Sequence, residues 1–131
     1  MLKFIHLTDT HLVPRSQTLF GLDPHARLAR AVADINQHHH DAQAAVITGD
    51  LSNWGGVEEY QSLRAALAPL ALPLVLLLGN HDNRHNFRQV FPDSALDEHG
   101  YVQSCLQTGS GRMIFLDTLL EGTHAGWLCE D

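Results

Sequence analysis

The sequence has 131 residues, enough for one domain with a buried core, and its apolar content of 44% is ordinary for a globular protein. Eight Lys and Arg against 15 Asp and Glu give a formal charge of −7, which argues against a broad nucleic-acid surface because such a surface needs clustered cations. No stretch approaches the ~20 apolar residues of a membrane span, and residues 1–6 do not resemble a signal peptide. Two cysteines, Cys105 and Cys129, are too few for a disulfide framework, so we expect a cytoplasmic protein.

The first third of the chain predicts a strand followed by a helix. Residues 2–8 are apolar in their middle and end in polar residues, which is typical of a strand. A loop over residues 12–22 leads to Asp23 and Pro24, and this pair predicts a helix start because Asp is a good N-cap and Pro suits the first helical position. Apolar residues then recur at helical spacing to about residue 38: Leu28, Val32 and Ile35.

The middle of the chain predicts two further strands, each followed by a helix. Residues 44–48 are apolar on both faces, as expected of a central parallel strand. Residues 57–68 predict a helix that Pro69 ends. Residues 74–78 predict the third strand, and residues 87–91 predict a short helix.

Two late segments, residues 101–106 and 112–117, predict a β-hairpin across the glycine-containing residues 109–111. The element order is therefore strand, helix, strand, helix, strand and hairpin. This order is typical of an α/β domain whose parallel strands are joined by right-handed crossovers.

Polar side chains follow each of the three predicted parallel strands. Asp9 and His11 follow the first strand, Asp50 follows the second, and Asn80 and His81 follow the third. Ligands of open α/β sheets bind beyond the carboxyl ends of the strands, so we expect these side chains to converge. Oxygen donors mixed with imidazole suit divalent Mn, Fe, Co or Zn, and a carboxylate after a central strand can bridge two ions ~3.5–4 Å apart.

Three blocks, Asp9-Thr10-His11, Gly49-Asp50 and Gly79-Asn80-His81-Asp82, resemble in order and spacing the first motifs of the calcineurin-like metallophosphoesterases. The detail is most similar to the bacterial class III cyclic-nucleotide phosphodiesterase and glycerophosphodiesterase branch. Further matching segments extend over nearly the whole chain: Phe20-Gly21, Glu58-Glu59-Tyr60, Leu116-Asp117 and Gly126-Trp127-Leu128. The resemblance implies a metal-dependent phosphodiesterase with a cyclic nucleotide or a glycerophosphodiester-like molecule as substrate.

The resemblance also implies a set of metal ligands. Asp9 and His11 would bind one divalent ion, Asp50 would bridge two ions, and Asn80 would bind the second, the metals being Fe, Mn, Zn or Co. The nucleophile would be a hydroxide held by the ions.

The same resemblance implies substrate and catalytic contacts. His81 would lie beside the substrate phosphate, where it would stabilise charge or protonate the leaving oxygen, and Asp82 would orient His81. Asn80 would contact substrate as well as metal. The position of Asn53 close behind Asp50 also favours a substrate contact.

The sequence departs from the family pattern in one respect: it contains no Gly-His dipeptide, whereas the family's later motifs carry histidine ligands after glycine. We therefore expect residues 1–131 to form the amino-terminal half of the family's four-layer α/β/β/α sandwich. An uncovered sheet edge and apolar face would favour a homo-oligomer or association with a carboxy-terminal half, together with weak metal binding and weak turnover.

Other interpretations stay open. A non-catalytic, partner-binding module is one alternative, and a phosphomonoesterase or nuclease is another, because the metal ligands are shared. Asp and Asn at strand ends also serve as turn and capping residues. Phe20 and Trp54 fit either a pocket wall or simple packing. We expect the remaining histidines to be solvated or packed rather than ligands: His6, His25, His38, His39, His40, His85, His99 and His124.

Overall fold

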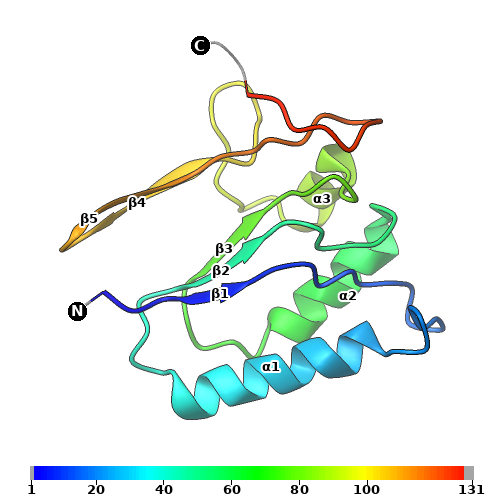
Figure 1. The fold of residues 1–131 in the computed structure, drawn as a ribbon, viewed down its shortest axis with the longest axis horizontal. Helices are drawn as coiled ribbons and strands as arrows, with labels where there is room; N and C mark the ends of the chain where they lie inside the picture. Colours follow the sequence, from blue (N-terminus) through cyan, green and yellow to red (C-terminus); the bar gives the residue numbers. More distant parts are fainter. Residues whose placement is uncertain (1, 129–131) are drawn as a thin grey trace.

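A three-stranded parallel sheet lies at the centre of the computed structural model, which describes residues 2–128 (Figure 1). The strands are β1 (Ile5–Leu7), β2 (Ala45–Thr48) and β3 (Leu74–Leu77). The central strand is β2, and it pairs in parallel with both neighbours. The predicted α/β class with parallel strands is confirmed, and the carboxyl ends of all three strands lie at one edge of the sheet.

Helices α1 (Pro24–His38) and α2 (Val57–Leu67) lie on one side of the sheet, and the late hairpin lies on the other (Figure 1). The short helix α3 (Arg84–Val90) follows β3. Buried side chains from helices and strands form one core cluster, which includes Leu28, Val32, Ile47, Leu63 and Leu76. Burial of this apolar surface fixes both helices against the sheet.

The helix starts follow from local hydrogen bonding. The predicted N-cap of α1 is confirmed, because Asp23 Oδ1 accepts a hydrogen bond from the Ala26 amide at 3.1 Å. Helix α2 uses a different device: buried Glu59 reaches back and accepts hydrogen bonds from the amides of Trp54 and Gly56, each at 3.1 Å. Glu59 thereby joins the helix start to the loop that follows β2.

The predicted hairpin is present, but its strands, β4 (Ser104–Thr108) and β5 (Gly111–Phe115), differ in their bounds from the sequence prediction. Residues 101–103 do not begin the first strand, because Asp97 holds them in a turn: its side chain accepts a hydrogen bond from the Tyr101 amide at 2.8 Å. The second strand ends at Phe115, two residues before the buried Asp117. The connection is a two-residue turn, since Thr108 pairs with Gly111.

An ion pair anchors the end of the hairpin to α3. Arg84 Nε and Nη2 donate to the two oxygens of Asp117 at 2.8 and 2.9 Å, and Nη2 also donates to the Leu119 carbonyl at 2.7 Å. Asp117 is 3% exposed. Burial alone would raise the pKa of Asp117, but hydrogen bonds from Arg84 and from the Val102 and Leu119 amides outweigh burial and hold this pKa below its ordinary value.

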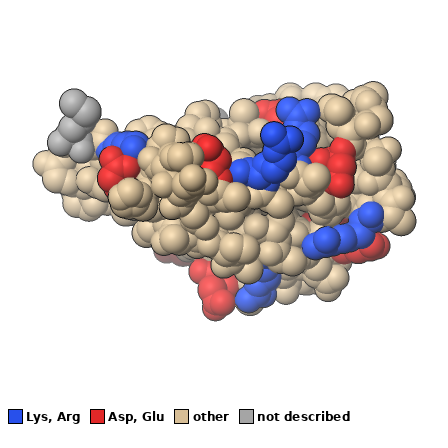
Figure 2. Space-filling model, turned by 90° about the horizontal axis from the view of Figure 1, so that it is seen from below, with Lys and Arg blue, Asp and Glu red and all other residues tan. Residues whose placement is uncertain are grey.

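The outer surfaces carry mixed charge. Figure 2, which views the molecule from below Figure 1, shows Lys and Arg side chains interspersed with Asp and Glu, so this face has no extended positive patch. Within residues 2–128, no helix is long and apolar enough to cross a membrane. Cys105 is an exposed free thiol, and Cys129 lies outside the described residues.

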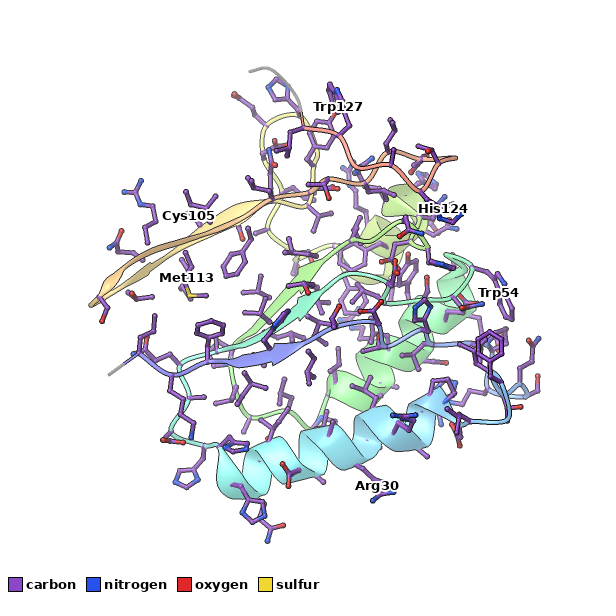
Figure 3. The ribbon with its side chains drawn as sticks, in the orientation of Figure 1. Arg30, Trp54, Cys105, Met113, His124 and Trp127 are labelled. Carbon is purple, nitrogen blue, oxygen red and sulfur yellow. The ribbon has the colours of Figure 1, made fainter. Side chains whose placement is uncertain are left out.

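We expect Arg84→Leu to lower the free energy of unfolding by about 3 kcal/mol, because it leaves the buried Asp117 carboxylate without its cation. Urea unfolding monitored by circular dichroism measures this change. Because the pKa of Asp117 is lowered in the folded state, its contribution is present above pH 3.8 and is lost as the pH falls below that value, so the variant and the wild type should converge in acid. The control is Arg30→Leu on α1, where the side chain points away from the body of the protein (Figure 3). An equal loss in the control would contradict this assignment.

Candidate metal centre

The ligating atoms of Asp9, His11 and Asp50 all lie within 4.8 Å of one another. His11 Nε2 is 3.7 Å from Asp9 Oδ1 and 3.7 Å from Asp50 Oδ2. The backbone brings these residues together, because the loops after β1 and β2 continue the parallel pairing: the Asp9 amide donates to Gly49 O at 3.1 Å and the His11 amide donates to Asp50 O at 2.9 Å. The predicted convergence of these three residues is therefore seen in the structure.

All three of these residues adopt backbone conformations that are uncommon outside glycine. Asp9, His11 and Asp50 have φ angles of 56°, 41° and 48°. Positive φ costs free energy for residues with a β-carbon, although Asp, Asn and His tolerate it better than most. The fold maintains this strain at the three residues whose candidate ligand atoms lie within 4.8 Å of one another.

Close backbone packing places the central carboxylate. A β-carbon on Gly79 would overlap both the backbone nitrogen and Oδ1 of Asp50, and one on Gly49 would lie 2.8 Å from the Gly79 nitrogen. Gly49 also has a φ of 98°. These two glycines therefore allow the loops after β2 and β3 to touch. Asp50 Oδ1 then accepts a hydrogen bond from the His81 amide at 3.0 Å, which ties the two loops together.

Asn53 orients two histidine rings. Its Oδ1 lies 3.1 Å from His11 Nδ1, and its backbone oxygen lies 2.9 Å from His81 Nδ1. Oxygen acceptors require a proton on each Nδ1, so in both neutral rings Nε2 carries the free lone pair. The rings themselves meet edge to face with centroids 4.9 Å apart. Since both Asn53 oxygens hold histidines, a substrate contact by Asn53 would have to come from its Nδ2 group.

Asp82 has a different role from the one expected. Its oxygens accept hydrogen bonds from the Leu51, Ser52 and Gly79 amides at 2.9–3.0 Å, and from the Tyr60 hydroxyl at 3.0 Å. It does not hold the His81 ring, which is bound by Asn53, so the predicted orientation of His81 by Asp82 is wrong. The reason is that the Asp82 side chain turns inward, where it is 7% exposed.

Burial raises the pKa of Asp82, while the three amides and the Tyr60 hydroxyl act in the opposite direction. Burial, together with the same pairing, raises the pKa of Tyr60 far above its ordinary value, so Tyr60 remains a hydrogen-bond donor. The Tyr60 hydroxyl in turn accepts a hydrogen bond from the Asn83 amide at 2.8 Å. Asp82 and Tyr60 thus support the backbone on which Asn80 and His81 lie.

Asn80 and His124 form a contact that the sequence did not indicate. Asn80 Nδ2 lies 2.7 Å from His124 Nδ1, and the His124 ring centroid is 6.1 Å from that of His81. Figure 3 shows His124 and Trp54 at the same end of the molecule, beyond the carboxyl ends of the strands. His124 is exposed, as expected of a surface residue, and the contact with Asn80 is an addition to that expectation.

A cavity of about 410 Å³ opens beside the cluster. Asp9 and His11 line it together with Phe20 and with apolar residues of the first loop and α1. Phe20 is 95% exposed with a φ of 51°, and Trp54 is 60% exposed. Simple packing therefore does not account for either aromatic side chain, and Phe20 forms part of a pocket wall.

The donor set fits a divalent cation. Two carboxylates and the free Nε2 of an imidazole face one point, and this mixture of oxygen and nitrogen donors is typical of first-row divalent metals. The strand ends and the cluster therefore define an α/β domain with a candidate metal centre.

The chain belongs to the calcineurin-like phosphoesterase family, whose model matches residues 2–123. This confirms the family and the fold that the motifs predicted, and the family implies divalent metal ions.

Several curated proteins are similar to the chain along nearly its whole length. A protein of Rhodopseudomonas palustris named "Probable cyclic nucleotide phosphodiesterase" is 44% identical over 98% of this chain and 48% of its own length. The cAMP/cGMP dual specificity phosphodiesterase of Mycobacterium tuberculosis is 34% identical over 97% of this chain and 44% of its own length. The glycerophosphodiester phosphodiesterase GpdQ of Enterobacter lignolyticus is 33% identical over 96% of this chain and 47% of its own length. The chain thus spans about half the length of these relatives.

Gly79→Ala should displace Asp50 and weaken metal binding, because the added methyl group overlaps the Asp50 backbone and carboxylate. The strain should also lower the free energy of unfolding by about 1–3 kcal/mol. Calorimetric titration with Mn²⁺ and thermal unfolding measure the two effects. Gly109→Ala in the hairpin turn is the matched control, since its added methyl group would have no described atom within 4 Å. Unchanged Mn²⁺ affinity in Gly79→Ala would contradict the close packing described above.

Proposed function

We propose that this protein hydrolyses small phosphodiesters with two divalent ions bound at Asp9, His11, Asp50 and Asn80. The observation that carries the proposal is the convergence of Asp9, His11 and Asp50 at the carboxyl ends of β1 and β2. Bound divalent ions would neutralise charge on the phosphate and lower the pKa of water. Fe, Mn, Zn and Co all suit this donor set.

Asp50 has the central position among the proposed ligands. Its Oδ2 faces His11 Nε2 at 3.7 Å, while its Oδ1 faces the loop that carries Asn80 and accepts from the His81 amide. One carboxylate thus lies between the residues proposed for the first ion and the residue proposed for the second. This placement supports a bridging role for Asp50.

His81 is the proposed general acid. Its Nδ1 lies 2.9 Å from the Asn53 carbonyl oxygen, so Nε2 is the ring nitrogen left for a substrate. In its doubly protonated form, His81 would pass the Nε2 proton to the leaving alkoxide oxygen as the phosphorus–oxygen bond breaks, and would keep the Nδ1 proton bound to Asn53. Asp82 contributes indirectly, because it holds the loops after β2 and β3 in place.

The proposed substrate is a small diester, a cyclic nucleotide or a glycerophosphodiester, as the names of the relatives state for those proteins. The cavity beside Asp9 and His11, with Phe20 on its wall, offers space for the organic part of such a molecule. The net charge of −7 and the mixed charges in Figure 2 support a small substrate rather than an extended nucleic acid. A cytoplasmic location also stays a prediction.

A non-catalytic module is the second candidate. The observation that favours it is the number of donors: Asp9, His11 and Asp50 serve the first ion, but only Asp50 and Asn80 are proposed for the second. The absence of Gly-His dipeptides from the sequence agrees with this count. Because the second ion has so few donors, we propose that residues 1–131 bind metal weakly and turn over substrate slowly.

Asp50→Asn should lower metal binding and turnover more than any other single substitution, because it removes a charge from both proposed ion sites. Asn tolerates the positive φ of this position.

His81→Ala should retain metal and lower turnover by about 10²–10⁴-fold, as expected for loss of a general acid. Hydrolysis of bis(p-nitrophenyl) phosphate and metal analysis measure both effects, and His85→Ala on the exposed face of α3 is the control. Turnover that survives exhaustive chelation would contradict the metal-dependent mechanism. Loss of metal in His81→Ala but not in Asp50→Asn would contradict the proposed roles of Asp50 as metal ligand and of His81 as general acid.

The hairpin and the segment that follows it present apolar side chains to solvent, and we propose that these side chains mediate self-association or association with a carboxy-terminal half. Ile114 of β5 is 65% exposed, and Leu116 and Trp127 are each almost half exposed. The outer strands β1 and β3 add sheet edges. Ile114→Glu should weaken self-association at least about tenfold, measured by sedimentation over a concentration series. Gln107→Glu on the neighbouring strand is the control, and a wild-type monomer at all concentrations would contradict self-association.

A further inference from the structure

His124 contacts the side chain of a proposed metal ligand from a distant part of the chain. Its Nδ1 lies 2.7 Å from Asn80 Nδ2, across a separation of 44 residues. Both side chains are exposed, so surrounding packing does not by itself fix the Asn80 rotamer. The hydrogen bond to His124 is the contact that orients the Asn80 amide.

The loop that carries His124 is fixed at its base. Leu119 and Gly126 form an antiparallel bridge, and the Trp127 amide donates to Thr118 O at 3.0 Å. Arg84 donates to the Leu119 carbonyl at 2.7 Å, and Arg84 lies only four residues after Asn80 in the sequence. The loop is therefore attached to the same segment that carries Asn80, and His124 is presented to Asn80 from a defined position.

The chemistry of the two groups determines which atoms remain free. An amide nitrogen donates hydrogen bonds and does not accept them, so His124 Nδ1 must be the acceptor and its ring proton must lie on Nε2. A neutral carboxamide binds a cation through its oxygen. With Nδ2 turned toward His124, Asn80 Oδ1 is the atom left for an ion.

We propose that His124 is a positioning residue that holds the Asn80 amide with Oδ1 available to the second divalent ion. The inference rests on the proposed two-ion function and adds a residue that does not touch the ion. Asn80 is the only uncharged oxygen donor among the proposed ligands, and a carboxamide oxygen binds a cation more weakly than a carboxylate does. A fixed orientation lowers the entropy that Asn80 loses on binding, so the second ion gains most from His124.

Two substitutions separate the hydrogen bond from the bulk of the ring. His124→Leu removes the acceptor and keeps an apolar side chain of moderate size. His124→Gln keeps an acceptor oxygen that can receive the Asn80 Nδ2 hydrogen. His85→Leu is the matched control, because His85 is an exposed histidine of α3 whose Nε2 contacts Gln89.

Titration of the protein with Mn²⁺, followed by calorimetry and by electron paramagnetic resonance, measures the two binding steps. His124→Leu should weaken the second step by about 10–100-fold and leave the first unchanged, the range typical for loss of a group that orients a ligand. His124→Gln should recover most of this loss, and His85→Leu should behave as the wild type.

The metal-free protein provides an independent test at about pH 8, where nitrogen NMR reports the tautomer of a neutral imidazole. Long-range ¹H–¹⁵N spectra should show His124 with an unprotonated Nδ1. A protonated Nδ1 would overturn the inference, and so would two Mn²⁺ ions bound with equal affinity by wild type and His124→Leu. A wild type that binds only one Mn²⁺ ion would overturn the proposed two-ion function together with this inference. A protonated Nδ1, or equal affinity in wild type and His124→Leu, would overturn the role of His124 alone.

Discussion

The site depends on one buried carboxylate. Asp82 accepts hydrogen bonds from the Leu51 and Ser52 amides after β2, and from the Gly79 amide after β3. Short parallel strands alone leave the loops beyond their ends free to move apart. The Asp82 bonds close these two loops onto each other, and the contact between Gly79 and Asp50 follows from that closure. The burial of an ionisable group here costs free energy, and several donors offset this cost.

Each of the three loops that follow β1, β2 and β3 carries a different part of the proposed site. The loop after β1 supplies Asp9 and His11, the loop after β2 supplies Asp50 and the orienting Asn53, and the loop after β3 supplies Asn80 and His81. Asn53 is a shared support, since its two oxygens set the tautomers of a proposed metal ligand and of the proposed general acid. The proposed metal binding and the proposed proton transfer would therefore be linked, because a shift of Asn53 would move both rings.

The sequence predicted the parts of the site that depend on topology. Carboxyl ends of parallel strands meet at one edge, so residues that directly follow each strand had to lie near one another. It did not predict the direction of Asp82, because an Asp next to His81 in sequence carries no information about amides from another loop. The His124 contact could not be found either, since it depends on how the loop after β5 folds back over 44 residues. The bounds of the hairpin strands were misplaced for a similar reason, because Asp97 and Asp117 bind backbone amides that a strand pattern does not reveal.

The left-handed backbone at Asp9, His11 and Asp50 would limit which metals the proposed site could be redesigned to prefer. Changing metal selectivity usually requires exchange of ligand side chains, for example a longer carboxylate or a thiolate. Asp, Asn and His are among the few residues that accept positive φ, whereas Glu and Cys lose backbone free energy there before any metal binds. The repertoire of ligands at these positions is thus restricted by main-chain conformation. A change of metal preference is more accessible through the residues that hold the ligands than through the ligands themselves.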